Sequence, residues 1–145
     1  MDNKSKRARV MVFGTFDGLH AGHLSFFRQA RGLLKGKSTL VASIARDKNV
    51  KRIKGVWPTL NERERLMLVK KCGLVDKVVL AGAGDHIPHI VRERPGIIAL
   101  GYDQGEYVKN LKKDLKNKGL TVKIIRLRPF KKRIFKNHLL KKLYP

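Results

Sequence analysis

Two histidines three residues apart are the side chains in this sequence best suited to chemistry. His20 and His23 stand where an apolar strand pattern gives way to a helical pattern, with Gly22 between them. A strand-to-helix junction offers free backbone N–H groups and the positive end of the helix dipole, which together favour a bound phosphate. Because residues three apart lie on one face of a helix, both imidazoles can point at that phosphate. Histidines that only cap or pack a helix end would give the same pattern, so the pair alone leaves both interpretations open.

The elements that would position this pair alternate between strand and helix along the chain. Periodicity predicts strands at 9–13, 39–45, 77–80, 97–100 and 120–127, and helices at 20–34, 61–72, 87–92 and 107–118. The second of these helices should begin near Asn61, which has a glutamate three residues later, as in a capping box. Strands that alternate with helices form a parallel sheet with helices on both faces. We therefore expect an α/β fold, a Rossmann-like parallel five-stranded sheet with helices on both faces.

Two glycines mark where a ligand should bind in such a sheet. Gly14 follows the first predicted strand and Gly101 follows the fourth. Ligands of open parallel sheets bind beyond the carboxyl ends of the strands, at the point where the strand order reverses. We therefore expect the loops that begin at these glycines to face one pocket. The basic segment at 46–58 is expected to be a loop as well.

Composition restricts the chain to a few classes of protein. Its 145 residues suit one domain at 1–145, with a flexible basic arm at 1–8 and a basic helix or tail at 131–145. The lone Cys72 excludes an internal disulfide, no segment has the pattern of a secretory signal, and no apolar run approaches the roughly 18 residues of a membrane span. These features predict a soluble, cytoplasmic protein without a membrane partner. The net charge of +23 favours a polyanionic partner, either a nucleic acid or a nucleotide.

The loop that holds the two histidines carries a family resemblance. The stretch Gly14-Thr15-Phe16-Asp17-Gly18-Leu19-His20-Ala21-Gly22-His23 resembles the signature G-T-F-D-x-x-H-x-G-H of the cytidylyltransferase-like nucleotidyltransferases, the H-x-G-H superfamily. The resemblance implies an enzyme that transfers the NMP part of an NTP to a phosphorylated small molecule and releases pyrophosphate. It also implies Mg²⁺ or another divalent cation, with ATP or CTP as the substrate, and a homodimer.

Within this family the chain most resembles archaeal-type FAD synthases, which transfer AMP from ATP to FMN. The resemblance rests on the stretches 45–47, 54–55, 100–104 and 128–132. One alternative is a CTP-dependent cytidylyltransferase acting on glycerol 3-phosphate or a similar alcohol phosphate, whose usual I-S-T-T stretch is replaced here by Ile134-Phe135-Lys136-Asn137. Lys136 and Asn137 are candidates for the lost hydroxyl contacts. A second alternative is a nucleic-acid-binding protein on a nucleotidyltransferase scaffold, which the high positive charge keeps open and which we favour less.

The resemblance also assigns roles to individual residues. The catalytic set is His20, His23, Lys54 and Arg65. The nucleotide-binding set is Gly14, Thr15, Phe16, Asp17, Ala21, Gly22, Gly101, Asp103, Gln104, Arg126, Arg128 and Phe130. No protein side chain is expected to bind the metal, because Mg²⁺ would be held by the NTP phosphates. Without the resemblance, Lys54 would be one surface lysine among many and Asp103 a turn residue. Trp57 is expected to fill the core, with a subunit contact or a flavin contact as alternatives.

Overall fold

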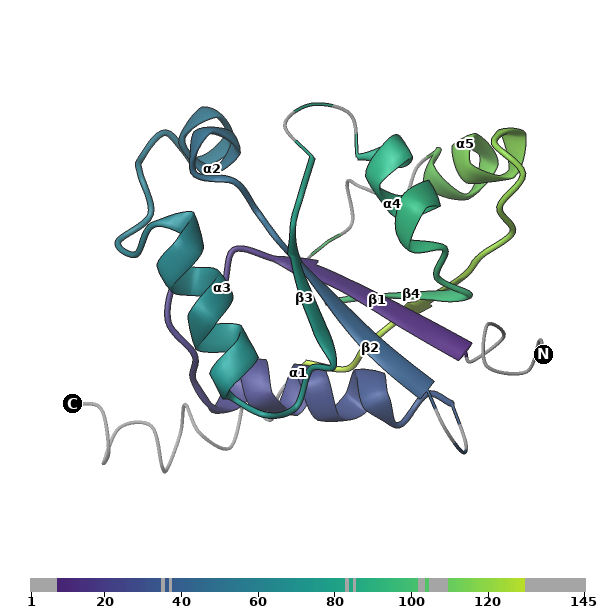
Figure 1. Cartoon of the computed structure of the whole chain (residues 1–145), viewed down its shortest axis with the longest axis horizontal. Helices are drawn as coiled ribbons and strands as arrows, with labels where there is room; N and C mark the ends of the chain where they lie inside the picture. The colour runs from purple at the N-terminus through teal and green to yellow at the C-terminus, as the bar shows by residue number, and fades with distance from the viewer. Residues whose placement is uncertain are drawn as a thin grey trace.

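The computed structural model describes residues 8–34, 36, 38–82, 84, 86–101, 104 and 110–129. Within these ranges strands and helices alternate along the chain (Figure 1). In chain order they are β1 (Ala8–Gly14), α1 (Ala21–Arg31), β2 (Ser38–Ile44), α2 (Asp47–Lys54), α3 (Glu62–Lys71), β3 (Lys77–Leu80), α4 (Ile87–Glu93), β4 (Ile97–Leu100), α5 (Leu111–Asn117) and β5 (Lys123–Arg126). The expected arm at 1–8 lies almost wholly outside the described residues, as does the tail at 131–145.

The strands form one five-stranded sheet in the order β3-β2-β1-β4-β5. Every pairing is parallel, with Val10 of β1 opposite Leu40 of β2 on one side and Ile97 of β4 on the other. The chain moves outward from β1 in both directions, so the strand order reverses beside β1. The crevice beyond the carboxyl ends of β1 and β4 is therefore the place where such a sheet binds its ligand. The Rossmann-like parallel sheet expected from the sequence is confirmed.

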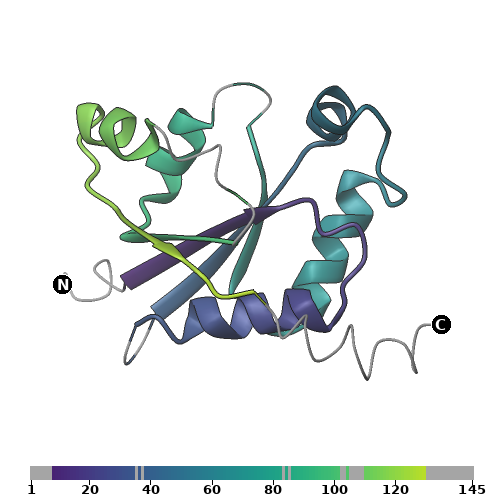
Figure 2. The ribbon, with the colours of Figure 1, turned by 180° about the vertical axis from the view of Figure 1, so that it is seen from behind.

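The two faces of the sheet carry separate apolar cores. Val10 and Val12 point to the face that packs against Phe27 of α1 and Val69 of α3. Met11 points to the opposite face, where the partners come from α4 and α5. This alternation follows from the two-residue period of a strand. Figures 1 and 2 show α1 and α3 on one side of the sheet and α4 and α5 on the other, in agreement with the two cores.

One element was missed by the sequence reasoning, because the segment expected to be a loop at 46–58 contains the helix α2. Only two of its eight residues, Val50 and Ile53, are apolar, which is too few for periodicity to identify a helix. The helix ends at Gly55, which has φ 82° in the left-handed region that favours glycine. Its N-terminal end is held by contacts from α3 that are described below. Contacts with residues distant in sequence, rather than a local pattern, therefore determine that this segment is helical.

Trp57 differs from expectation in another way, because its side chain is 59% exposed instead of filling the core.

The remaining elements agree closely with their predicted ranges. The capping box at Asn61 is present, since its side chain accepts the backbone N–H of Glu64 and the Glu64 carboxylate accepts the N–H of Asn61. The last strand is shorter than expected, and α5 begins at Leu111; residues 105–109 lie outside the described residues. Among the described helices, none combines the length and apolar character needed to cross a membrane.

Candidate active site

The first turn of α1 is closed by the two histidines themselves. Nδ1 of His20 accepts the backbone N–H of Gly22 at 3.0 Å, and Nδ1 of His23 accepts the backbone N–H of His20 at 3.3 Å. The two rings stack with their centroids 3.9 Å apart. The pair thus occupies the capping positions that Ser or Thr and Glu usually fill at a helix start. Because capping uses one nitrogen of each ring, it leaves the other nitrogen for a ligand.

The free nitrogen of each ring is Nε2. A nitrogen that accepts an N–H carries no proton, so the neutral tautomer of both rings has its proton on Nε2. Burial, with a smaller effect of the neighbouring His20, lowers the pKa of His23 from 6.5 to about 4. His23 is therefore a neutral hydrogen-bond donor through Nε2 at physiological pH. A donor of this kind suits an anionic phosphate oxygen.

This pKa predicts how the stability of the fold depends on pH. Above pH 6.5 His23 is neutral in both the folded and the unfolded chain, and its titration has no effect there. As the pH falls from 6.5 to about 4, the unfolded chain takes up the proton first, so the free energy of unfolding decreases. We expect His23→Gln, which keeps an acceptor at the third helical position, to reduce this loss. Urea unfolding of both proteins above pH 6.5 and near pH 4 measures it, and equal losses would contradict the assignment.

Gly14 and Phe16 shape the loop from inside. Phe16 is 4% exposed and has φ 53°, an uncommon conformation for an aromatic residue. Its ring packs on Phe27 at a centroid distance of 5.1 Å and stands edge-on to His23 at 5.5 Å. A Cβ added to Gly14 would lie 2.6 Å from this ring, so a larger residue does not fit. Phe16 thus packs against the ring of His23, and Gly14 leaves the space that the Phe16 ring occupies.

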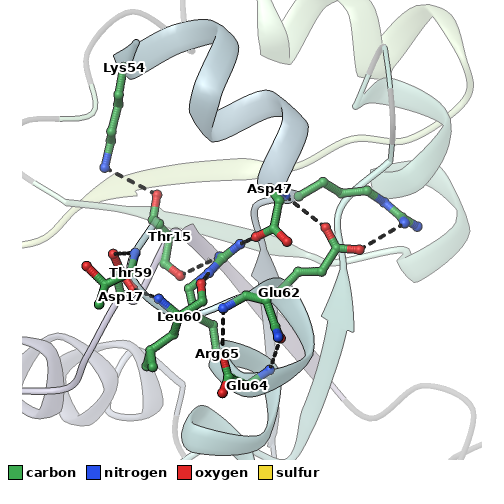
Figure 3. A network of polar contacts seen from close by, with 11 residues as sticks. Thr15, Asp17, Asp47, Lys54, Thr59, Leu60, Glu62, Glu64 and Arg65 are labelled. Atoms are coloured by element: carbon green, nitrogen blue, oxygen red, sulfur yellow. Dashed lines mark hydrogen bonds and ion pairs between the residues drawn. The ribbon is translucent and has the colours of Figure 1, made fainter. Parts of the chain in front are cut away.

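Asp17 joins the histidine loop to the segment before α3. Its carboxylate accepts the backbone N–H of Thr59 at 2.7 Å and that of Leu60 at 2.8 Å (Figure 3). The hydrogen bonds from Leu60 and Thr59 lower the pKa of this carboxyl, so the ionised form is favoured. Both carboxylate oxygens are used in these bonds. In this structure Asp17 organises the loop by bonding it to the segment before α3.

Arg65 lies beneath the same loop and is 0% exposed. Its Nε donates to the carbonyl of Leu60 at 2.9 Å, and one terminal nitrogen donates to the carbonyl of Thr15 at 2.8 Å. The other terminal nitrogen donates to Asp47 at 2.6 Å, and Figure 3 shows the guanidinium between these partners. A triphosphate contact, as expected from the sequence, requires an accessible guanidinium. Here all three nitrogens instead hold protein oxygens that belong to three different segments.

Asp47 connects Arg65 to α2. It is the first residue of that helix, and its backbone N–H donates to the carboxylate of Glu62 at 2.8 Å. Glu62 also forms an ion pair with Arg46 at 3.6 Å. The opposite end of α2 carries Lys54, whose Nζ lies 3.4 Å from the hydroxyl of Thr15. Lys54 is exposed and lies next to the histidine loop.

The loop after β4 meets the loop after β1 through one amide. Gln104 donates from Nε2 to the carbonyl of Phe13 at 3.0 Å and accepts the backbone N–H of Gly101 at 2.8 Å. Arg126 reaches the same place, since its guanidinium donates to the carbonyl of Gly101 at 3.1 Å. The two loops are therefore neighbours at the switch point of the sheet, as expected. Ala21 and Gly22 form the first turn of α1 beside them.

The backbone of Arg128, another expected site residue, lies beside the C-terminal part of α1. Its backbone N–H and carbonyl pair with the side-chain amide of Gln29 at 3.1 Å each. Gln29 lies nine positions after His20, about 13 Å along the helix axis at 1.5 Å per residue. The backbone of Arg128 is thus held beside the last turns of α1, away from the histidines. Asp103, Phe130, Lys136 and Asn137 lie outside the described residues.

The described residues include no group of three or more His, Cys, Asp or Glu side chains placed to hold a metal ion. The first turn of α1 has no acidic residue either. The helix dipole, the two Nε2 donors and Lys54 give this junction chemistry that suits an anion. A phosphate or polyphosphate is the ligand chemistry that fits.

Comparison with known proteins identifies the family of this chain. The model of the cytidylyltransferase-like family matches residues 11–142. The FAD synthase of Korarchaeum cryptofilum is 43% identical over 84% of this chain and 82% of its own length, and that of Methanosarcina barkeri is 40% identical over 82% of each. A crystal structure of a lipopolysaccharide core biosynthesis protein from Thermoplasma volcanium superposes with a TM-score of 0.77 at 35% identity, over 85% of this chain and 98% of that one. With its signature loop at the switch point of a parallel sheet, this chain belongs to the cytidylyltransferase-like family.

Proposed function

We propose that this chain is an FAD synthase, which transfers AMP from ATP to FMN and releases pyrophosphate. The observation that carries the proposal is the pair of histidines that cap α1 with Nδ1 and keep Nε2 free to donate. Relatives that are 40% and 43% identical over most of their length, and are FAD synthases, support ATP and FMN as the substrates. ATP would enter as its magnesium complex, with the ion held by phosphate oxygens.

The chemistry is an in-line displacement at the α-phosphorus of ATP. A phosphate oxygen of FMN forms the new P–O bond, and the bond to the β-phosphate oxygen breaks to release pyrophosphate. The attacking oxygen is already anionic at neutral pH, so the chain needs no general base. Its task is to position the two anions and to stabilise charge on the transferring group. His20 and His23 would donate from Nε2 to the phosphate oxygens, and Lys54 would neutralise their charge.

Other site residues would support this reaction without touching the reacting atoms. We propose that Arg65 and Asp17 position the histidine loop and the start of α3 through the bonds described above. Gln104 and Gly101 would face the nucleoside in the crevice between β1 and β4. We also propose that residues 1–145 form one domain, that the protein is a homodimer and that it is cytoplasmic. These properties suit an enzyme whose substrates are soluble nucleotides.

A substrate matrix tests the proposed function. ATP and CTP are each combined with FMN and with glycerol 3-phosphate in the presence of Mg²⁺, and pyrophosphate and the adduct are measured. We expect FAD and pyrophosphate in equal amounts from the pair ATP and FMN, and no product from the other three pairs. Transfer of CMP to glycerol 3-phosphate without FAD formation would instead assign a cytidylyltransferase. A chain that released no pyrophosphate and bound RNA with a steep salt dependence would point to the nucleic-acid-binding alternative.

A further inference from the structure

An exposed apolar segment lies between two anchors of the site. Ile53, Val56 and Trp57 are 67%, 63% and 59% exposed, although all three are large apolar side chains within five residues. Ile53 belongs to the last turn of α2, and the other two follow Gly55 directly. Scattered exposed apolar residues are common, but an apolar group next to a ligand site is typical of a binding surface.

The two anchors fix this segment beside the histidine loop. Lys54, next to Ile53, contacts the Thr15 hydroxyl, and Thr59, two residues after Trp57, is bonded to Asp17 (Figure 3). An extended chain spans at most about 3.6 Å per residue, so the backbone of Trp57 lies within about 7 Å of that of Thr59. The backbone of Trp57 is therefore held near the histidine loop, and its side chain is exposed there.

The order of the strands indicates which substrate meets this segment. The nucleoside is expected in the crevice between β1 and β4, on one side of the histidine loop. The segment at 53–57 follows β2, which pairs with the opposite edge of β1. FMN must approach the α-phosphorus of ATP from a side that the nucleoside does not occupy. The side of β2 is thus the side left for the acceptor.

We propose that Trp57, with Ile53 and Val56, forms the surface on which the isoalloxazine ring of FMN stacks, and this rests on the proposed function. The isoalloxazine is a planar aromatic system, and an exposed indole offers it a flat face of matching size. FMN joins this ring to a phosphate dianion, and the last turn of α2 joins the apolar side chains to three cations, Lys51, Arg52 and Lys54. The surface and the ligand therefore match in both shape and charge.

Steady-state kinetics of three variants test the subsite. Trp57→Ala is expected to raise the KM for FMN about tenfold, in line with the loss of one stacked ring, and to leave the KM for ATP and kcat unchanged. Trp57→Phe keeps an aromatic face and should stay near the wild type. Met67→Ala removes another exposed apolar side chain, 46% exposed on α3, and is the matched control. An unchanged KM for FMN in Trp57→Ala, or an equal rise in both KM values, would overturn the proposal.

Direct binding separates this proposal from the proposed function. Trp57 is the chain's single tryptophan, so its fluorescence reports on this position alone. Riboflavin, which has the ring without the phosphate, should quench it with saturation, whereas ribitol 5-phosphate should not. If the wild type binds riboflavin in this way but makes no FAD, the proposed reaction fails and the subsite stands. The affinity of Trp57→Ala, which lacks this signal, is measured from the fluorescence of riboflavin itself. If the wild type makes FAD while Trp57→Ala keeps its full affinity for riboflavin, the subsite fails and the reaction stands.

Sedimentation of the same variants examines the other possible occupant, a second copy of this chain. The proposal expects Trp57→Ala to have the same oligomeric state as the wild type at every concentration. A change from dimer to monomer in this variant, with no change in riboflavin affinity, would assign the segment to a subunit interface and overturn the flavin site.

Discussion

Replacement of His23 by alanine is expected to lower kcat for pyrophosphate release by about 10²- to 10³-fold, the usual effect of removing one donor to a transition state. The donor is Nε2, which is protonated because Nδ1 accepts the backbone N–H of His20. The lowered pKa, about 4, keeps the ring neutral across the working range, so the loss should be the same throughout neutral pH. Initial rates with saturating ATP and FMN measure the effect.

Two further variants separate chemistry from helix capping in this experiment. His23→Gln retains a capping acceptor, so a large loss of kcat in both variants would trace to the imidazole donor rather than to the helix end. His86→Ala, at the start of α4 on the other face of the sheet, is the matched control and should keep the wild-type rate. Unchanged pyrophosphate release by His23→Ala would contradict the assigned role. Circular dichroism establishes that each variant keeps its secondary structure.

The sequence predicts best where short-range patterns decide the structure. The first strand, the loop and α1 follow one another because a short apolar run ends at Gly14 and helical periodicity begins after His20. The start of α3 was placed correctly for the same reason, since Asn61 and Glu64 form a local capping box. The start of α1 and the start of α3 are each formed by residues that lie close together in the sequence. The capping contacts at these two helix starts need no information from the rest of the chain.

The features that the sequence did not predict depend on partners far away in the chain. The start of α2 is held by Arg65, eighteen positions after Asp47, and no local pattern announces that contact. The burial of Arg65 itself was hidden for the same reason, because arginine is usually exposed and the three acceptors come from separate segments. Trp57 was expected inside because tryptophan is usually well buried. It is exposed because it lies in the connection between α2 and α3, outside both apolar cores.

Replacement of Arg65 by leucine is expected to destabilise the fold by about 3–5 kcal/mol, because it leaves a partly buried carboxylate without its counter-ion. Asp47 would lose its ion pair, and the carbonyls of Thr15 and Leu60 would lose their donors. This is a large part of the roughly 5–15 kcal/mol that stabilises an ordinary domain. Urea unfolding measures the change. Arg63→Leu, an exposed arginine on the same helix, is the control and should have little effect.

The activity of these variants decides between a positioning role and a phosphate contact for Arg65. If Arg65 acts through the loop, kcat should fall together with stability, because Lys54 and the histidine loop lose their common support. Arg65→Lys keeps the charge but not the three-way fork, so it should recover only part of both. Removing Asp47 as well should restore part of the lost stability, since the unpaired carboxylate is then gone. A stable Arg65→Leu variant whose only defect was a raised KM for ATP would instead show that the guanidinium reaches the triphosphate.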